Sequence, residues 1–224
     1  MRTKKHNNHK QFNNNMVNKL TTLPKAPVAG ATTYAALIPF LPCPGEWLHL
    51  ADISRALGQP HPTVRLWLAR LEMQGLLQKT HKGRMSLFHV NLQSPLVLDA
   101  LAIAEKLALI RKLRESPLLA AVVDAIHAHV QEDSLIFGSA AEDIKKAGDI
   151  DMLILGSAKQ SALQDALAWT KKRAHIIAVS GTGKISPGLR AELIRTHLLI
   201  QGTERFVRWM HWPASDGANN SVGE

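Results

Sequence analysis

Cysteine and long apolar runs are what this sequence most lacks. Its 224 residues include one cysteine, Cys43, which excludes an internal disulfide and a metal site built from several cysteines. No apolar stretch reaches the length of a membrane span, and the first residues contain no apolar signal stretch. We therefore expect a cytoplasmic protein.

Acidic residues are missing from the start of the chain. Residues 1–25 hold six Lys/Arg and no Asp/Glu, and residues 26–92 hold six against three, so most of the net charge of +9 lies there. Such an excess of positive charge attracts phosphate backbones. For residues 1–25 alone a solubilising tail is the competing interpretation. The low-complexity composition up to residue 30 predicts a disordered basic arm.

Apolar spacing after residue 30 predicts three short helices followed by two strands. In the third helix Val64, Leu68 and Leu71 are spaced for one buried face, and Trp67 lies close to that face, as a core residue would. The two strands are joined by the basic turn His81-Lys82-Gly83-Arg84, whose glycine suits a hairpin. The expected helices span residues 32–41, 49–57 and 62–74, and the expected strands 76–80 and 85–91.

This order of elements, with the motifs Leu50-Ala51-Asp52-Ile53-Ser54-Arg55-Ala56-Leu57-Gly58 and Thr63-Val64-Arg65, resembles the winged helix-turn-helix regulators of bacteria and archaea. The resemblance implies that the third helix enters the major groove of double-stranded DNA and that the hairpin tip lies over the backbone. Arg70 could instead be an ordinary solvated charge, and some winged helices bind proteins rather than DNA. The predicted DNA-binding residues are His61, Thr63, Arg65, Arg70, Lys82 and Arg84.

The remaining chain predicts a helical connector and then a small α/β unit. Helices are expected over residues 95–115 and 117–131. Beyond them, short apolar runs suited to buried strands alternate with helical patterns. The expected strands span 135–137, 150–155, 175–180 and 198–201, and the expected helices 160–173, 188–197 and 203–209.

A second motif lies in this α/β unit. A strand ends in Gly138-Ser139, and after nine residues the next strand begins with Asp149-Ile150-Asp151. A glycine lets the backbone approach a phosphate, and a serine at a helix start offers a hydroxyl and an amide. Residues that alternate along a strand point to one side, so both carboxylates could hold Mg²⁺ together. The motif resembles the minimal nucleotidyltransferases of the DNA polymerase beta superfamily.

That resemblance implies nucleotide binding at Gly138 and Ser139 and a metal-holding, catalytic pair in Asp149 and Asp151. Relatives carry a third carboxylate on the neighbouring strand, but the expected strand 175–180 contains no Asp or Glu. Asp165 and Glu192 fall in predicted helices, where we do not expect them to complete the site. His175 could act as a base in place of the missing acid or could be structural.

We therefore predict an α+β protein with a mixed sheet in its second half. The predicted function is a DNA-binding transcriptional regulator whose nucleotidyltransferase-like domain binds a nucleoside triphosphate and Mg²⁺ with impaired catalysis. The alternatives are an active nucleotidyltransferase modifying a protein or small molecule, as relatives in toxin–antitoxin pairs do to a HEPN-type partner, and a structural interaction protein. A homodimer through residues 95–131 is a further expectation. The predicted divisions are a basic arm 1–30, a winged helix 31–92, a connector 93–132, the nucleotidyltransferase-like domain 133–211 and a disordered tail 212–224.

Overall fold

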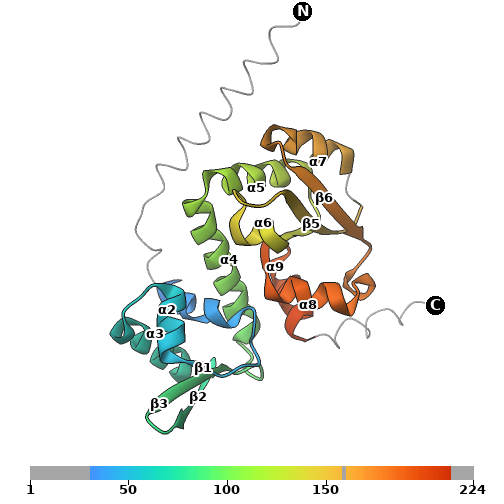
Figure 1. Cartoon of the computed structure of the whole chain (residues 1–224). Helices are drawn as coiled ribbons and strands as arrows, with labels where there is room; N and C mark the ends of the chain where they lie inside the picture. Colours follow the sequence, from blue (N-terminus) through green and yellow to red (C-terminus); the bar gives the residue numbers. More distant parts are fainter. Residues whose placement is uncertain (1–30, 158–159, 213–224) are drawn as a thin grey trace, which may run out of the picture.

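The computed structural model describes residues 31–157 and 160–212 and has a mixed α/β architecture with two sheets (Figure 1). The basic arm predicted at 1–30 lies outside the described residues, and so does the predicted tail apart from Trp212. We refer to residues 31–92 as the N-terminal module and to residues 133–211 as the C-terminal module. These boundaries stay predictions.

All three helices predicted in the N-terminal module are present. The first, η1 (Ala31–Phe40), is a 3-10 helix that contains Pro39. The second, α2 (Leu50–Leu57), ends at Gly58, whose φ of 62° is in the left-handed region that favours glycine. The third, α3 (His61–Met73), has a proline in its first turn and buries Val64, Leu68 and Leu71 as predicted.

The three-stranded antiparallel sheet has the order β1-β3-β2. The strands predicted after α3 are β2 (Leu77–Lys82) and β3 (Met85–Val90), and Lys82 pairs with Met85. The turn therefore consists of Gly83 and Arg84, shorter than the four-residue turn predicted. The sequence did not predict β1 (Leu48–His49), which is only two residues long and pairs with β3.

The two connector helices are present at nearly the predicted positions. The helix α4 (Val97–Glu115) spans 19 residues, and α5 (Pro117–His129) follows it directly. The Ser116 hydroxyl accepts a hydrogen bond from the Leu119 amide at 3.3 Å and so caps the start of α5. No helix in the described part of the chain is long and apolar enough to cross a membrane.

The second sheet is mixed, as predicted, with the strand order β6-β5-β4-β7. Its strand β4 (Asp133–Phe137) pairs antiparallel with β5 (Asp149–Leu155) and with β7 (His197–Gln201). The fourth strand, β6 (Arg173–Val179), pairs parallel with β5. The strands are connected by α6 (Gly138–Asp143), α7 (Gln160–Leu167) and α8 (Pro187–Arg195), and α9 (Thr203–His211) follows the last strand.

One predicted helix is too long. A single helix was expected over 160–173, but α7 ends at Leu167 and a short 3-10 turn, η2 (Ala168–Thr170), follows it. The chain then reverses at Lys171, which has a left-handed φ of 59°. Arg173 therefore opens β6 instead of ending a helix.

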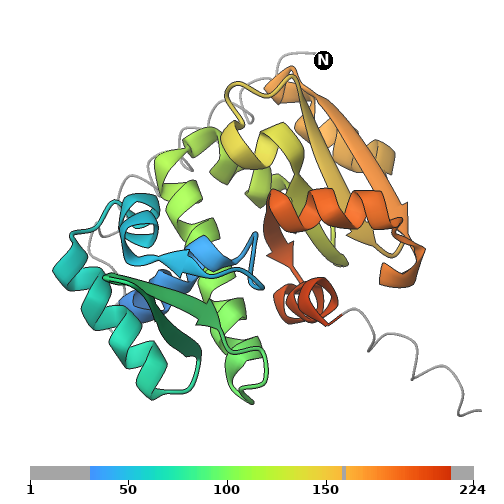
Figure 2. The ribbon, with the colours of Figure 1, turned by 60° about the horizontal axis from the view of Figure 1, so that its bottom comes forward.

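Each face of the second sheet belongs to a different hydrophobic cluster. Alternate residues such as Leu135, Phe137 and Leu153 pack with α8 and α9 and join a cluster that continues through α4 into the N-terminal module. Residues facing the other way, such as Ile136 and Met152, pack with α5, α6 and α7. Figure 2 shows α4 running between the two sheets. The first cluster therefore links the two modules into one core.

Candidate functional site

The solvent face of α3 carries unpaired cations. Val64, Leu68 and Leu71 hold the helix to the core, so the opposite side of the helix points outward. Arg65 and Arg70 are exposed, and Leu66 between them is 51% exposed. Among the described residues neither guanidinium has an ion-pair partner. This face is thus free to contact an external partner.

The β2–β3 hairpin presents more cations beyond the end of that helix. As an edge strand, β2 exposes every side chain from Gln78 to Lys82. Lys82 and Arg84 flank Gly83 at the tip and are exposed. Lys79 differs, because its ammonium group lies 5.9 Å from the centre of the Phe88 ring in a cation–π contact.

The predicted DNA-contacting residues lie as follows. His61, Arg65, Arg70, Lys82 and Arg84 are exposed, whereas Thr63 is half-buried. Trp67 is half-buried against the core, in agreement with its prediction as a packing residue. The sequence interpretation omitted His81, which is also exposed on β2. His81 lies on β2, an edge strand that is exposed on both sides, so the alternation of apolar and polar residues along the sequence does not indicate that His81 is exposed.

The second candidate site lies where β4 ends and β5 and β6 begin. Gly138 follows β4 with a φ of 64° and starts α6, as expected from the motif. A Cβ atom at Gly138 would lie 3.3 Å from Asp151 Oδ2 and 3.9 Å from Glu192 Oε1. Glycine is therefore needed here for its backbone conformation and for the close approach of a carboxylate. Ser139 is exposed beside it.

Asp149 and Asp151 share one side of β5, because Ile150 between them is fully buried on the other. Asp151 is in register with His175 on the parallel neighbour β6. The His175 Nδ1 atom lies 3.2 Å from Asp151 Oδ1. A histidine thus stands beside Asp151, on the strand where the resemblance places a third carboxylate.

The sequence did not predict that the Glu192 carboxylate lies near Gly138. It does lie in a helix, α8, but the carboxylate approaches Asp151 across Gly138. The reason is packing: α8 covers the sheet face to which Asp149 and Asp151 belong, through Leu189 and Leu193. Sequence periodicity identifies the helix but does not say which end of the sheet it covers.

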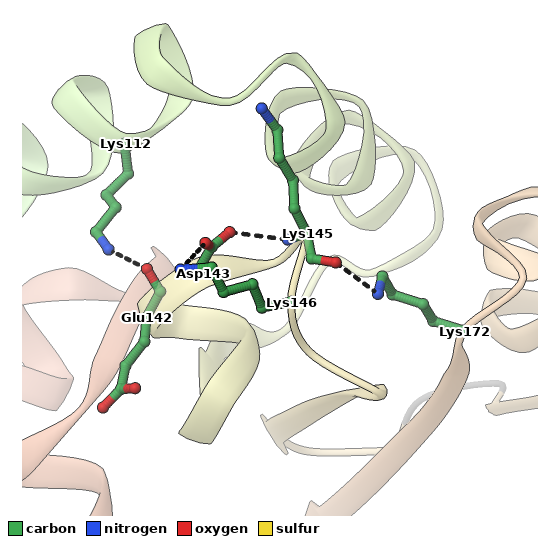
Figure 3. A network of polar contacts seen from close by, with 6 residues as sticks. All are labelled: Lys112, Glu142, Asp143, Lys145, Lys146 and Lys172. Atoms are coloured by element: carbon green, nitrogen blue, oxygen red, sulfur yellow. Dashed lines mark hydrogen bonds and ion pairs between the residues drawn. The ribbon is translucent and has the colours of Figure 1, made fainter.

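A network of lysines fixes the loop between α6 and β5 (Figure 3). The Asp143 carboxylate accepts a hydrogen bond from the Lys145 amide at 3.0 Å, which lowers the pKa of Asp143, and it also lies 3.5 Å from the Lys146 ammonium. Lys172, just before β6, donates to the carbonyl oxygens of Lys145 and Ala147. These contacts hold the chain immediately before Asp149.

A buried ion pair joins the connector to the second sheet. His197 on β7 lies 2.9 Å from Glu105 on α4, through Nε2 and Oε1, and the two side chains are 5% and 4% exposed. The Nδ1 atom of His197 also lies 2.5 Å from the Leu193 carbonyl oxygen. Burial lowers the pKa of His197, but the charge and hydrogen bond of Glu105 raise it, and the net shift is upward. Both partners, a carboxylate and a carbonyl oxygen, are acceptors, so the site suits an imidazole that donates from both ring nitrogens.

Asp149 and Asp151 are the residues predicted to hold Mg²⁺. Within residues 31–157 and 160–212, no group of three or more His, Cys, Asp or Glu side chains is arranged to hold a metal ion. Mg²⁺ commonly uses one or two carboxylates and completes its shell with water and substrate phosphates. Asp149 and Asp151 fit that mode, in which a nucleotide and the metal bind together.

No family model matches the chain, and no curated protein matches it. Among solved structures, BpsR of Bordetella bronchiseptica, whose DNA binding is regulated by 6-hydroxynicotinic acid, matches with 18% identity and a TM-score of 0.29, over 49% of this chain and 79% of its own. TrmBL2, an archaeal chromatin protein with a novel mode of DNA binding, matches with 17% identity and a TM-score of 0.24, over 74% and 68%. At these TM-scores the likeness carries no argument about this chain.

Proposed function

We propose that this protein is a cytoplasmic DNA-binding transcriptional regulator whose N-terminal module is a winged helix. The observation that carries the proposal is the division of α3 into a fully buried apolar face and a solvent face with unpaired Arg65 and Arg70. In this arrangement α3 enters the major groove, and Lys82 and Arg84 contact the phosphate backbone.

The test is binding of the purified chain to genomic DNA fragments at moderate salt. We expect retardation of specific fragments and an affinity that falls linearly with the logarithm of salt concentration. Arg65→Gln and Arg70→Gln each weaken binding about tenfold, and Lys82→Ala lowers the salt slope by about one. Arg55→Ala is the control, because Arg55 is exposed on the adjacent α2 but paired with Asp52 at 2.8 Å. No retardation of any fragment rules the proposal out.

For the C-terminal module we propose nucleotidyltransferase-like binding of a nucleoside triphosphate with Mg²⁺. The supporting observation is the convergence of Gly138, Asp151, His175 and Glu192 beside the start of a helix. Gly138 and Ser139 would hold phosphate oxygens, and Asp149 and Asp151 would hold the metal. The bound Mg²⁺ would supply charge stabilisation at the phosphates.

A thermal-shift titration tests this second proposal. Because a ligand that binds only the folded state stabilises it, each binding nucleotide raises the melting temperature, and more so with Mg²⁺. The rise disappears in the Asp149→Ala/Asp151→Ala double variant and persists in Asp165→Ala, whose exposed carboxylate lies on α7. The proposal fails if no nucleoside triphosphate shifts the melting temperature.

The alternative is an active nucleotidyltransferase with a protein or small-molecule acceptor, for which a HEPN-type partner is the candidate implied by the resemblance. His175 favours this alternative, because its ring contacts Asp151 where a base would be needed. Incubation with labelled ATP and Mg²⁺ distinguishes the two. Transfer of label that His175→Ala abolishes, with nucleotide binding retained, makes the module an enzyme.

A further inference from the structure

The solvent side of α3 carries an apolar row along its middle. Leu66 is 51% exposed and Met73 is 82% exposed, and Pro62 and Ala69 are exposed as well. Their spacing follows the period of about 3.6 residues per turn, so the four side chains lie one above another on one side of the helix. This helix lies on the outside of the N-terminal module (Figure 1 and Figure 2). The name α3 row is used below for Pro62, Leu66, Ala69 and Met73.

The two arginines of α3 lie on opposite flanks of the α3 row. At about 100° per residue, Arg65 lies about 70° to one side of the centre of the row and Arg70 about 70° to the other side. Both are exposed. Glu72 is the only acidic residue of the helix and lies near its carboxyl end. Most of α3 therefore presents an apolar centre between two cations.

This division matches the two chemical surfaces of the major groove. If α3 enters the groove, as the proposed function requires, its flanks face the two phosphate backbones and its centre faces the base edges. Arg65 and Arg70 then lie beside phosphates, to which their charges are complementary. The α3 row, which has no side-chain hydrogen-bond donor or acceptor, lies against the bases.

An apolar row can contact few features of a base edge favourably. Most groups in the major groove are hydrogen-bond donors or acceptors, and covering one of them with an apolar side chain leaves it unpaired at a cost in free energy. Thymine is the exception, because it presents a methyl group there. The chemistry of the α3 row is therefore complementary to thymine.

We propose that Leu66 recognises the methyl group of thymine and so makes the protein prefer DNA with thymine opposite the α3 row. This inference rests on the proposed DNA-binding function. Leu66 lies in the second turn of α3, within the half of a recognition helix that contacts bases. Ala69, about one turn further on, has a side chain small enough to let the helix backbone approach the bases. The flanking arginines, with Lys82 and Arg84 of the hairpin, favour DNA over a protein partner for this surface.

The test removes only the methyl groups from the DNA. A genomic fragment that the full chain retards is amplified with deoxyuridine triphosphate in place of thymidine triphosphate, because uracil pairs as thymine does but lacks the methyl group. We expect affinity to fall about fourfold for each methyl group that Leu66 contacts, from the apolar area that stays in water. Replacing the thymines one at a time then locates the contacted positions.

The variant Leu66→Ala assigns the loss to this side chain. It should keep its fold, because Leu66 lies on the surface. We expect it to bind the thymine fragment about tenfold more weakly than the parent protein and the uracil fragment less than about twofold more weakly, because the contact is already absent there. Ile103→Ala is the matched control, since Ile103 is also an exposed apolar residue, at 39%, but lies on α4. It leaves the affinity for both fragments unchanged.

The outcomes separate this inference from the proposed function. Equal affinity of the parent protein for the thymine and uracil fragments overturns thymine recognition and leaves DNA binding standing. Equal weakening of both fragments by Leu66→Ala overturns the assignment to Leu66. Absence of retardation of any fragment overturns the DNA-binding function together with this inference, and favours a protein partner for the α3 row.

Discussion

At the scale of single residues, two histidines near the end of the chain respond to pH in opposite directions. His211 is largely buried, and burial, together with the charges of His197 and Arg190, lowers its pKa to about 4, although Glu105 acts the other way. Its Nε2 atom is buried with no hydrogen-bond partner in the described structure. His197, by contrast, has a raised pKa because of Glu105, in spite of its burial.

These shifts predict a stability maximum near pH 6.5. Between pH 6.5 and about 4 the unfolded chain protonates His211 and the folded chain does not, so acidification lowers the free energy of unfolding. The loss over this range is about 3 kcal/mol. Above pH 6.5 the contribution of His197 is lost as its raised pKa is passed. Urea unfolding at a series of pH values measures the loss of stability below and above pH 6.5.

The variant His211→Phe tests whether His211 causes the loss of stability below pH 6.5. It removes both the titration and the unpaired nitrogen, so the difference from the parent protein should grow as the pH falls below 6.5. His127→Gln, at an exposed position on α5, is the control and leaves the loss of stability below pH 6.5 unchanged. A difference between His211→Phe and the parent that does not depend on pH would contradict the buried, neutral His211.

In the second candidate site, around Gly138, sequence spacing predicts the positions of some residues but not of others. The positions of Gly138, Asp149 and Asp151 are predictable because they follow from one turn and one strand. The approach of Glu192 is not, because it depends on how α8 packs over the sheet. The contact of His175 with Asp151 requires the register of two parallel strands, which periodicity does not give.

At the scale of elements, α3 offers a direct comparison of its two faces. Leu68 is fully buried and Leu66 is 51% exposed, although they are only two residues apart. We expect Leu68→Ala to lower the free energy of unfolding by about 2–5 kcal/mol through the lost burial and the cavity it leaves. Leu66→Ala should cost less than about 0.5 kcal/mol, as for most surface substitutions. Denaturant unfolding compares them, and equal effects would contradict the assigned orientation of α3.

Helices whose ends are marked by proline, glycine or serine lie where the sequence predicts them. A proline lies in the first turn of α3, and a glycine follows shortly after its end. A serine cap followed by Pro117 begins α5. These helix ends are therefore encoded by nearby residues. The two-residue β1 exists only because β3 pairs with it, which is a tertiary effect. The end of α7 depends on Lys171 adopting a left-handed conformation, for which lysine carries no signal.

At the scale of the whole molecule, the sequence predicts separate domains, but the described structure has a shared core. Composition and charge change near residue 93, which suggests a boundary there. The larger cluster nevertheless includes Phe40 and Val64 of the N-terminal module together with Phe206 and Trp209 of α9. Long-range packing of this kind leaves no mark on local composition.

The shared core predicts that both modules unfold together. Leu101 on α4 is fully buried in the larger cluster. We expect Leu101→Ala to lower the opening free energy of β3 and β5 amides equally, by about 2–4 kcal/mol, because the cavity destabilises one cooperative unit. Arg111→Ala, on an exposed position of α4, is the control and changes neither. Native-state hydrogen exchange measures both strands in one experiment. Should only β3 respond, with calorimetry showing two transitions, the modules would be independent, and α4 would not join them into one cooperative unit.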